Sequence, residues 1–190
     1  MKFGITQGRL TNERKGILQK FPKNWEKEFF FLTKTKLDYI ELFLENKINK
    51  NNPIWSKIGQ KKLIKKLEKT KLKHHIVCDN YILNKSLYSK DIIRYYKKLF
   101  KSVKAINCKL LIIPIDNKNF LPKNLPKFVN FIFFLKKEAK KNKVKISLEV
   151  NENYEKFSKI LSINRINDIK ITFDTGNFYL TNKDVFKSLK

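Results

Sequence analysis

The chain has 190 residues, 42% hydrophobic and 13% aromatic, so it can bury the core of one domain, and this composition excludes a disordered polypeptide. Its formal charge is +26, from 43 basic and 17 acidic residues. Two cysteines are too few for a disulfide scaffold, and no apolar run approaches the roughly 20 residues that span a bilayer.

Short apolar runs alternate with stretches of helical periodicity along the chain. The pattern predicts, in order, a strand over residues 2–6, a helix over 25–35, a strand over 37–43, a helix over 56–69, a strand over 72–78, a helix over 90–106, a strand over 109–115, a helix over 125–141, a strand over 144–150, a helix over 153–161, a strand over 170–174 and a helix beginning near 181. Strands joined by single helices run parallel, because a parallel connection needs a crossover of a dozen or more residues.

Two architectures fit six such βα units, an open doubly wound sheet and a (β/α) barrel. No strand is followed by a glycine-rich phosphate loop, which weakens the nucleotide-binding alternative. Polar residues instead follow strand after strand, and in a barrel these carboxyl ends converge on one face. We therefore predict one α/β domain over residues 1–190, an incomplete (β/α) TIM-type barrel of about six parallel strands.

Two carboxylates end consecutive predicted strands, Glu149 in "VKISLEV" and Asp174 in "IKITFD". Oxygen ligands of this kind suit Mg²⁺ and Mn²⁺ and partly suit Zn²⁺. The alternative is that each acid is solvated or caps the next helix. Gly176 favours the first interpretation, because glycine permits a tight turn or a close backbone approach to a ligand.

Several motifs in colinear order carry a resemblance to a known family. They are "ITQGRL" at residues 5–10, "GILQKFPKNWEKEF" at 16–29, "LDYIELF" at 37–43, "VCDNY" at 77–81, "LLIIPID" at 110–116, "ISLEVN" at 146–151 and "ITFDTGN" at 171–177. Together they resemble the sugar phosphate isomerase/epimerase family, which has the xylose isomerase-like TIM barrel. The resemblance covers essentially the whole chain and implies proton abstraction next to a carbonyl of a small sugar or sugar phosphate in carbohydrate metabolism.

The resemblance implies a divalent metal ion (Mn²⁺, Mg²⁺ or Zn²⁺) bound by Glu149 and Asp174, with Glu149 also acting as a catalytic acid/base. Asn177 stands where many relatives have a histidine. A histidine and a glutamate expected from a seventh and an eighth strand have no counterpart in the sequence. We therefore also expect an incomplete site, so the sequence leaves open whether this chain is an enzyme.

Substrate contacts are predicted at the mouth of the barrel from Gln7, Arg9, Glu41, Asp79 and Asn177, which follow or end strands. Three of them have an alternative role. Arg9 could form a salt bridge with a neighbouring strand-end acid, Glu41 could pair with a lysine, and Asp79 could be solvated.

The high charge raises the question of a polyanionic partner. Only four of the 43 basic residues are arginines, the residue favoured for specific recognition, and the lysines are spread along the chain. We therefore expect no specific nucleic acid and no membrane partner, a cytoplasmic location, and self-association through the open edge between the first and sixth strands.

Three other classes compete with the isomerase/epimerase hypothesis. The first is a catalytically incomplete fragment or decayed copy of such a barrel. The second is a basic nucleic-acid-binding protein, whose binding would weaken steeply with salt. The third is a relative of abasic-site endonucleases, which is disfavoured because His74 and His75 are adjacent on a strand and face opposite ways.

Overall fold

The computed structural model describes residues 2–11, 20–70, 72, 74–150, 154–166 and 169–175. Its six strands form one parallel sheet in the order β1-β2-β3-β4-β5-β6. They are β1 (Gly4–Thr6), β2 (Tyr39–Leu44), β3 (His74–Asp79), β4 (Leu110–Ile115), β5 (Lys145–Val150) and β6 (Lys170–Thr172). The six predicted parallel strands are confirmed, although β6 ends two residues before the predicted boundary.

Five α-helices alternate with these strands in the described residues. They are α1 (Trp25–Leu32), α2 (Lys57–Glu68), α3 (Lys90–Ala105), α4 (Leu125–Asn142) and α5 (Tyr154–Ile163), with short 3₁₀ turns η1 (Pro53–Trp55), η2 (Asn80–Ile82), η3 (Asn117–Phe120) and η4 (Pro122–Asn124). Serine caps begin two of them, since Ser56 Oγ accepts from the Gly59 amide at 3.0 Å and Ser89 Oγ from the Ile92 amide at 3.3 Å. The helix expected near residue 181 lies outside the described residues. Within the described part, no helix is both long and apolar enough to cross a membrane.

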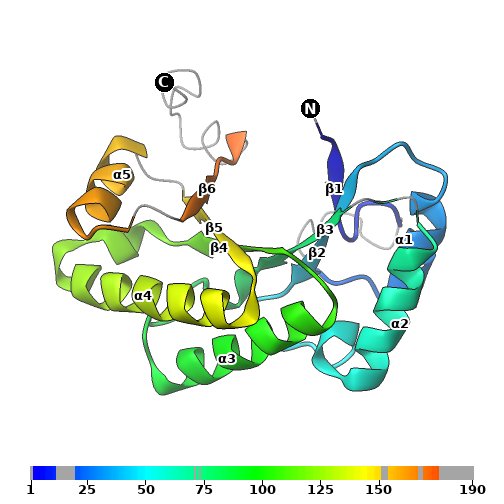
Figure 1. Ribbon diagram of the computed structural model, residues 1–190, viewed down its shortest axis with the longest axis horizontal. Coiled ribbons are helices and arrows are strands. Elements are labelled where there is room, and N and C mark those ends of the chain that lie inside the picture. The colour runs from blue at the N-terminus through cyan, green and yellow to red at the C-terminus, as the bar shows by residue number, and fades with distance from the viewer. Residues whose placement is uncertain are drawn as a thin grey trace.

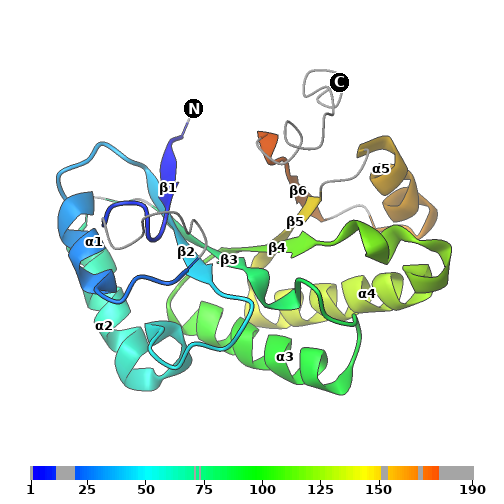
Figure 2. The ribbon, with the colours of Figure 1, turned by 180° about the vertical axis from the view of Figure 1, so that it is seen from behind.

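The main hydrophobic core lies between the sheet and its helices. Ile40, Val77, Leu111 and Leu148, which come from four neighbouring strands, are each 0% exposed and belong to one cluster with aromatic residues of the helices such as Phe128. Burying each such side chain stabilises the fold by about 1.5–3 kcal/mol. The helices of the described residues lie on one face of the sheet (Figures 1 and 2).

The sheet is strongly curved, with α1 to α5 around its outer face and β1 and β6 at its two ends in both views (Figures 1 and 2). In the described residues, β1 pairs with β2 alone and β6 with β5 alone. The arrangement is that of a barrel wall that is not closed, as the sequence predicts. The inner face of this wall is the concave one.

Candidate active site

One face of β5 carries Lys145, Ser147 and Glu149, because side chains alternate between the two faces of a strand. Leu148, between the last two, is fully buried in the core beneath the helices, so Ser147 and Glu149 lie on the inner face. The register places Glu149 beside Thr172 of β6. The hydroxyls of Ser147 and Thr172 are 2.7 Å apart and form a hydrogen bond across the two strands.

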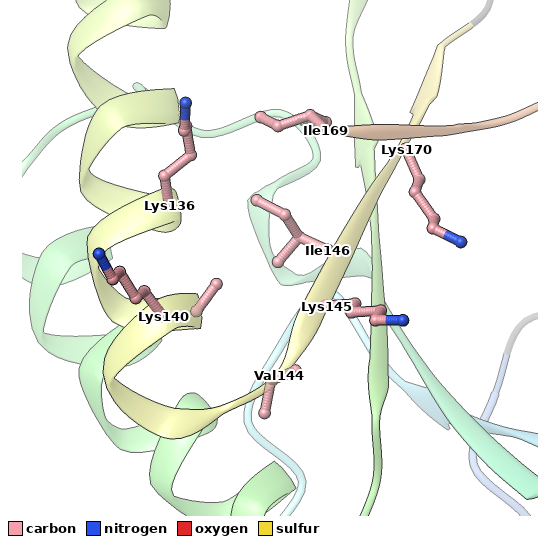
Figure 3. Close-up of a pocket in the computed structure, with 8 residues that line it drawn as sticks. Lys136, Lys140, Val144, Lys145, Ile146, Ile169 and Lys170 are labelled. Carbon is pink, nitrogen blue, oxygen red and sulfur yellow. The ribbon is translucent and has the colours of Figure 1, made fainter. Parts of the chain in front are cut away.

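The neighbouring strand repeats this order of side chains. Lys170, Thr172 and Asp174 are each two residues apart, so β6 and its extension present a lysine, a hydroxyl and an acid in the same sequence as β5. Lys145 and Lys170 point away from α4, onto the other side of the strands (Figure 3). The lysines thus lie at the amino ends of the strands and the acids at the carboxyl ends.

The pocket in Figure 3 belongs to the amino ends of these strands. Its volume is about 470 Å³, and apolar side chains of Ala139, Val144, Ile146 and Ile169 line it together with lysines. It opens between α4 and the start of β5 and β6, at the opposite end from Glu149. It is therefore separate from the candidate active site.

Several strand-end acids lie close enough to Cys78 to influence its thiol. Cys78 is buried, and burial raises the pKa of its thiol well above the ordinary value, with further increases from the charges of Glu41, Glu149, Asp79 and Asp174. Three of these acids belong to β2, β5 and the end of β6. The curvature of the sheet has therefore brought carboxylates from distant strands into one electrostatic environment.

Glu41 is the most constrained of these acids. Its Oε1 accepts a hydrogen bond from the Thr6 hydroxyl at 3.0 Å. Burial raises the pKa of Glu41, and the charge of Asp174 adds to the increase, whereas the Thr6 hydrogen bond and the charge of Arg9 oppose it. Glu41 thus holds a proton more readily than an exposed glutamate, and the charges of both Arg9 and Asp174 act on it.

Gln7 lies where β1 ends, and it is 3% exposed. Its backbone N–H donates to the Glu41 carbonyl at 2.8 Å, and its side-chain Oε1 accepts from the Phe43 amide at 3.2 Å. The side chain therefore extends the pairing of β1 with β2. Its Nε2 is buried without a hydrogen-bond partner among the described residues, so one amide donor remains for a ligand.

The turn after β1 depends on Glu28, a residue that the sequence reasoning missed. Gly8 has φ of 94°, which favours glycine, and its N–H donates to Glu28 Oε1 at 2.6 Å. The Leu10 amide donates to the same oxygen at 3.3 Å. A signal for this role existed, because Glu28 falls on the buried stripe of α1 with Trp25 and Phe29.

Arg9 is exposed on this turn and forms no salt bridge with an acid of the described residues. The described residues therefore do not show the alternative role, in which Arg9 pairs with a strand-end acid. Gly8 and Glu28 fix the backbone on both sides of Arg9. Its guanidinium influences Glu41 through its charge alone.

Asp79 does not reach the inner face, although the sequence reasoning placed it at the mouth. It follows Cys78, so alternation turns it toward the helices, where its Oδ1 accepts from the Tyr95 hydroxyl at 2.7 Å and from the Tyr81 amide at 3.3 Å. His75 also lies on the helix side, with Nε2 at 2.8 Å from the Ile106 carbonyl. Asn177 lies outside the described residues.

A complete metal site is not formed by the described residues alone. In residues 2–11, 20–70, 72, 74–150, 154–166 and 169–175, no three His, Cys, Asp or Glu side chains are grouped so that they could hold a metal ion. Alternation from Ser147 and Thr172, whose hydroxyls are hydrogen-bonded, places Glu149 and Asp174 on the inner face, and each has a further interaction. The two predicted ligands are thus on the same side of the sheet.

The sequence matches no protein-family model and no curated protein. Solved structures nevertheless match over nearly the entire chain. A sugar phosphate isomerase/epimerase from Parabacteroides distasonis aligns with a TM-score of 0.65 and 11% identity, covering 98% of this chain and 69% of that one. D-psicose 3-epimerase, determined with D-fructose, gives 0.69 and 13%, covering 100% and 68%. The chain has the xylose isomerase-like TIM-barrel fold.

The IolI protein, whose structure holds a zinc atom, is a third neighbour of this barrel. It aligns with a TM-score of 0.68 and 16% identity, covering 100% of this chain and 68% of IolI. The barrel described here therefore spans about two thirds of the length of these three neighbours. The structural similarity establishes the predicted fold. Six strands are what about two thirds of an eight-stranded barrel would supply.

Proposed function

We propose that this protein is a sugar or sugar-phosphate isomerase/epimerase that moves a proton next to a carbonyl group. The observation that carries the proposal is the convergence of Glu41, Glu149 and Asp174 on the inner face, around Cys78. Solved structures of the same fold support it, since they include a sugar phosphate isomerase/epimerase and a sugar epimerase. In TIM-barrel enzymes, chemistry is built at the carboxyl ends of the strands, where these acids lie.

Glu149 and Asp174 are the residues that would hold a divalent cation. Two carboxylates on adjacent strands suit Mg²⁺ or Mn²⁺, which take oxygen ligands and retain several waters. The remaining ligands would be waters, substrate oxygens or residues outside the described ranges. When bound, such an ion acts as a Lewis acid toward a carbonyl oxygen.

The remaining roles, proton transfer and substrate binding, belong to the side chains of this protein. In this proposal Glu149 takes a proton from the substrate carbon and returns it. Glu41, whose pKa is raised and whose Oε1 accepts from the Thr6 hydroxyl, hydrogen-bonds a substrate hydroxyl. Arg9 is exposed at the mouth and suits a phosphate group, and Gln7 has a free amide donor for a hydroxyl.

Titration of Mn²⁺ into the protein by calorimetry tests the carboxylate pair. We expect saturable binding at one site per chain, weakened by about tenfold or more in Asp174→Asn and in Glu149→Gln, because each substitution removes an anionic ligand. A protein with a formal charge of +26 repels cations in general, so saturable uptake reports a local site.

Glu68→Gln serves as the matched control, because Glu68 is an exposed acid at the end of α2. It should bind Mn²⁺ as the wild type does. Titrations in which Glu68→Gln and Asp174→Asn are indistinguishable would remove the proposed role of Asp174.

A catalytically incomplete copy of the barrel is the second candidate. It is favoured by the finding that the described residues supply no group of three metal ligands. Mn²⁺ binding by the pair, together with no turnover of ketose or ketose-phosphate substrates, would support it over the enzyme. Under either candidate, the outer edges of β1 and β6, which pair with no further strand in the part of the chain that the structure describes, favour association with a second copy. The two free thiols favour a reducing compartment such as the cytoplasm.

A further inference from the structure

A groove between α3 and α4 carries a concentration of positive charge outside the barrel wall. Its volume is about 640 Å³, and its lining includes Lys90, Arg94 and Lys97 of α3 and Lys137 of α4. The three α3 cations are spaced by four and three residues, so they lie on one face of the helix. The acid among the lining residues is Glu138, which is 7% exposed. The groove therefore has a net charge of +3.

These cations repel each other in the free protein, because like charges three or four residues apart destabilise a helix. Within the described residues, the one salt bridge of these cations joins Arg94 Nη1 to Asp91 Oδ1 at 3.2 Å, and both side chains are about four-fifths exposed (80% and 82%). It leaves the other guanidinium donors of Arg94 free to bind. A ligand with several negative charges would relieve the repulsion.

The same groove presents aromatic surface. Tyr88 lines one part of it, is 48% exposed and has φ of 60°, a left-handed conformation that is uncommon for a bulky residue. Phe134 of α4 lines another part and is half-buried, with its ring stacked near Phe131 at 6.4 Å between centroids. Aromatic rings beside a row of cations are what binds successive bases and phosphates of a single strand.

We propose that the α3–α4 groove binds single-stranded nucleic acid without preference for base sequence. Lysines outnumber the single arginine in the lining, and lysine is a point charge that does not read base edges as the arginine fork does. The binding is thus compatible with the expected absence of a specific nucleic-acid partner. A membrane surface is disfavoured, because it is too broad to enter a groove between two helices.

The groove is independent of the proposed function. Helices α3 and α4 lie side by side on the outer face of the sheet in both views (Figures 1 and 2), whereas Glu149 and Asp174 lie on the inner face. Loss of one site therefore leaves the other testable.

Fluorescence anisotropy with a labelled oligouridylate of about 12 nucleotides tests the proposal. The groove variant is Arg94→Glu/Lys97→Glu/Lys137→Glu. The control is Lys57→Glu/Lys61→Glu/Lys65→Glu, which reverses three exposed lysines of α2 and changes the net charge equally. We expect the groove variant to lose about tenfold or more in affinity, and the slope of log K against log salt to fall by about 2, because each lost phosphate contact contributes about 0.7. The control should lose less than about threefold.

Tyr88 supplies a second, uncharged test. Tyr88→Ala should weaken binding by about fivefold or more, and Tyr88→Phe, which keeps the ring, should restore it. Equal losses in the two charge-reversed variants would overturn the proposal, because they would assign binding to delocalised charge. It would also be overturned by a Tyr88→Ala variant that binds as the wild type does. A third result would also overturn it. If the wild type binds phosphatidylserine vesicles but not oligouridylate, and the groove variant loses the vesicle binding, the groove binds a membrane surface instead.

Discussion

Replacing Asp79 by asparagine is expected to raise the free energy of unfolding near neutral pH by about 2 kcal/mol. The carboxyl group is fully buried, and burial raises its pKa from 3.8 to about 6, although the hydroxyls of Tyr95 and Tyr96, the Tyr81 amide and the charge of Lys85 favour the ionised form. A pKa raised from 3.8 to about 6 corresponds to about 3 kcal/mol, an upper limit for the cost of ionising the buried group. Asparagine avoids that cost because it does not ionise.

Because the pKa of Asp79 is raised in the folded protein, its contribution to the free energy of unfolding decreases as pH rises. The stability that protonated Asp79 contributes is complete below its ordinary pKa of 3.8 and is lost as pH rises through about 6. Urea denaturation should therefore show the smallest difference between wild type and Asp79→Asn below about pH 4. The two should diverge between about pH 4 and pH 6 and then differ by a constant amount above about pH 6. Neither Asp79 Oδ2 nor the Tyr96 hydroxyl has a well-formed hydrogen bond in the described residues, and the asparagine amide could donate to that hydroxyl.

Asp91→Asn is the control for this experiment, because Asp91 is a strongly exposed aspartate of α3. It should leave the pH dependence between about pH 4 and pH 7 unchanged. An Asp79→Asn variant whose free energy of unfolding differs from that of the wild type by the same amount at about pH 4 and at about pH 7 would contradict the assignment.

The second large effect is expected at Glu28, where alanine should lower the free energy of unfolding by about 3 kcal/mol. Glu28 is fully buried, and its Oε1 accepts from the amides of Gly8 and Leu10. Alanine would leave the buried Gly8 amide and the partly buried Leu10 amide without their acceptor, and each such loss costs about 1–3 kcal/mol when the donor is buried. The turn that presents Arg9 would also lose its anchor. The proposed binding of a phosphate group by Arg9 should therefore weaken even in the fraction of the variant that is folded.

Glu26→Ala is a matched control on the same helix. Glu26 lies 2.8 Å from Lys66 in a salt bridge with both side chains partly exposed (45% and 37%), and such pairs contribute about 0–1 kcal/mol. Urea denaturation of the two variants should therefore differ by about 2 kcal/mol or more. Equal destabilisation would show that the buried contacts of Glu28 do not anchor the turn.

Much of the fold could be predicted from the sequence, because the signals are local. Period-two alternation in "KISLEV" already places Ser147 and Glu149 on one face, and helical spacing in "SKDIIRYY" with Ser89 as cap identifies the start of α3. The repetition of βα units then requires parallel strands. The six strands follow from these features, and the polar residues at successive strand ends favour a barrel over an open sheet.

The site could be predicted only in part, because its decisive relations connect residues far apart in the chain. Alternation predicts that Cys78 and Asp79 face opposite ways, but the packing of Tyr95 decides that Asp79 is the one buried beneath the helices. The interaction of Glu41 with Asp174 depends on the curvature that brings β2 toward β6.

The amino-acid sequence by itself determined the order of strands and helices, the parallel sheet and the alternation that gives each strand its two faces. The tertiary structure alone decided which face is the interior, which acids share it, and that Glu28 closes the turn at Gly8. The physical reason is that periodicity is encoded between neighbouring residues. Burial and charge coupling arise only when packing brings distant side chains together.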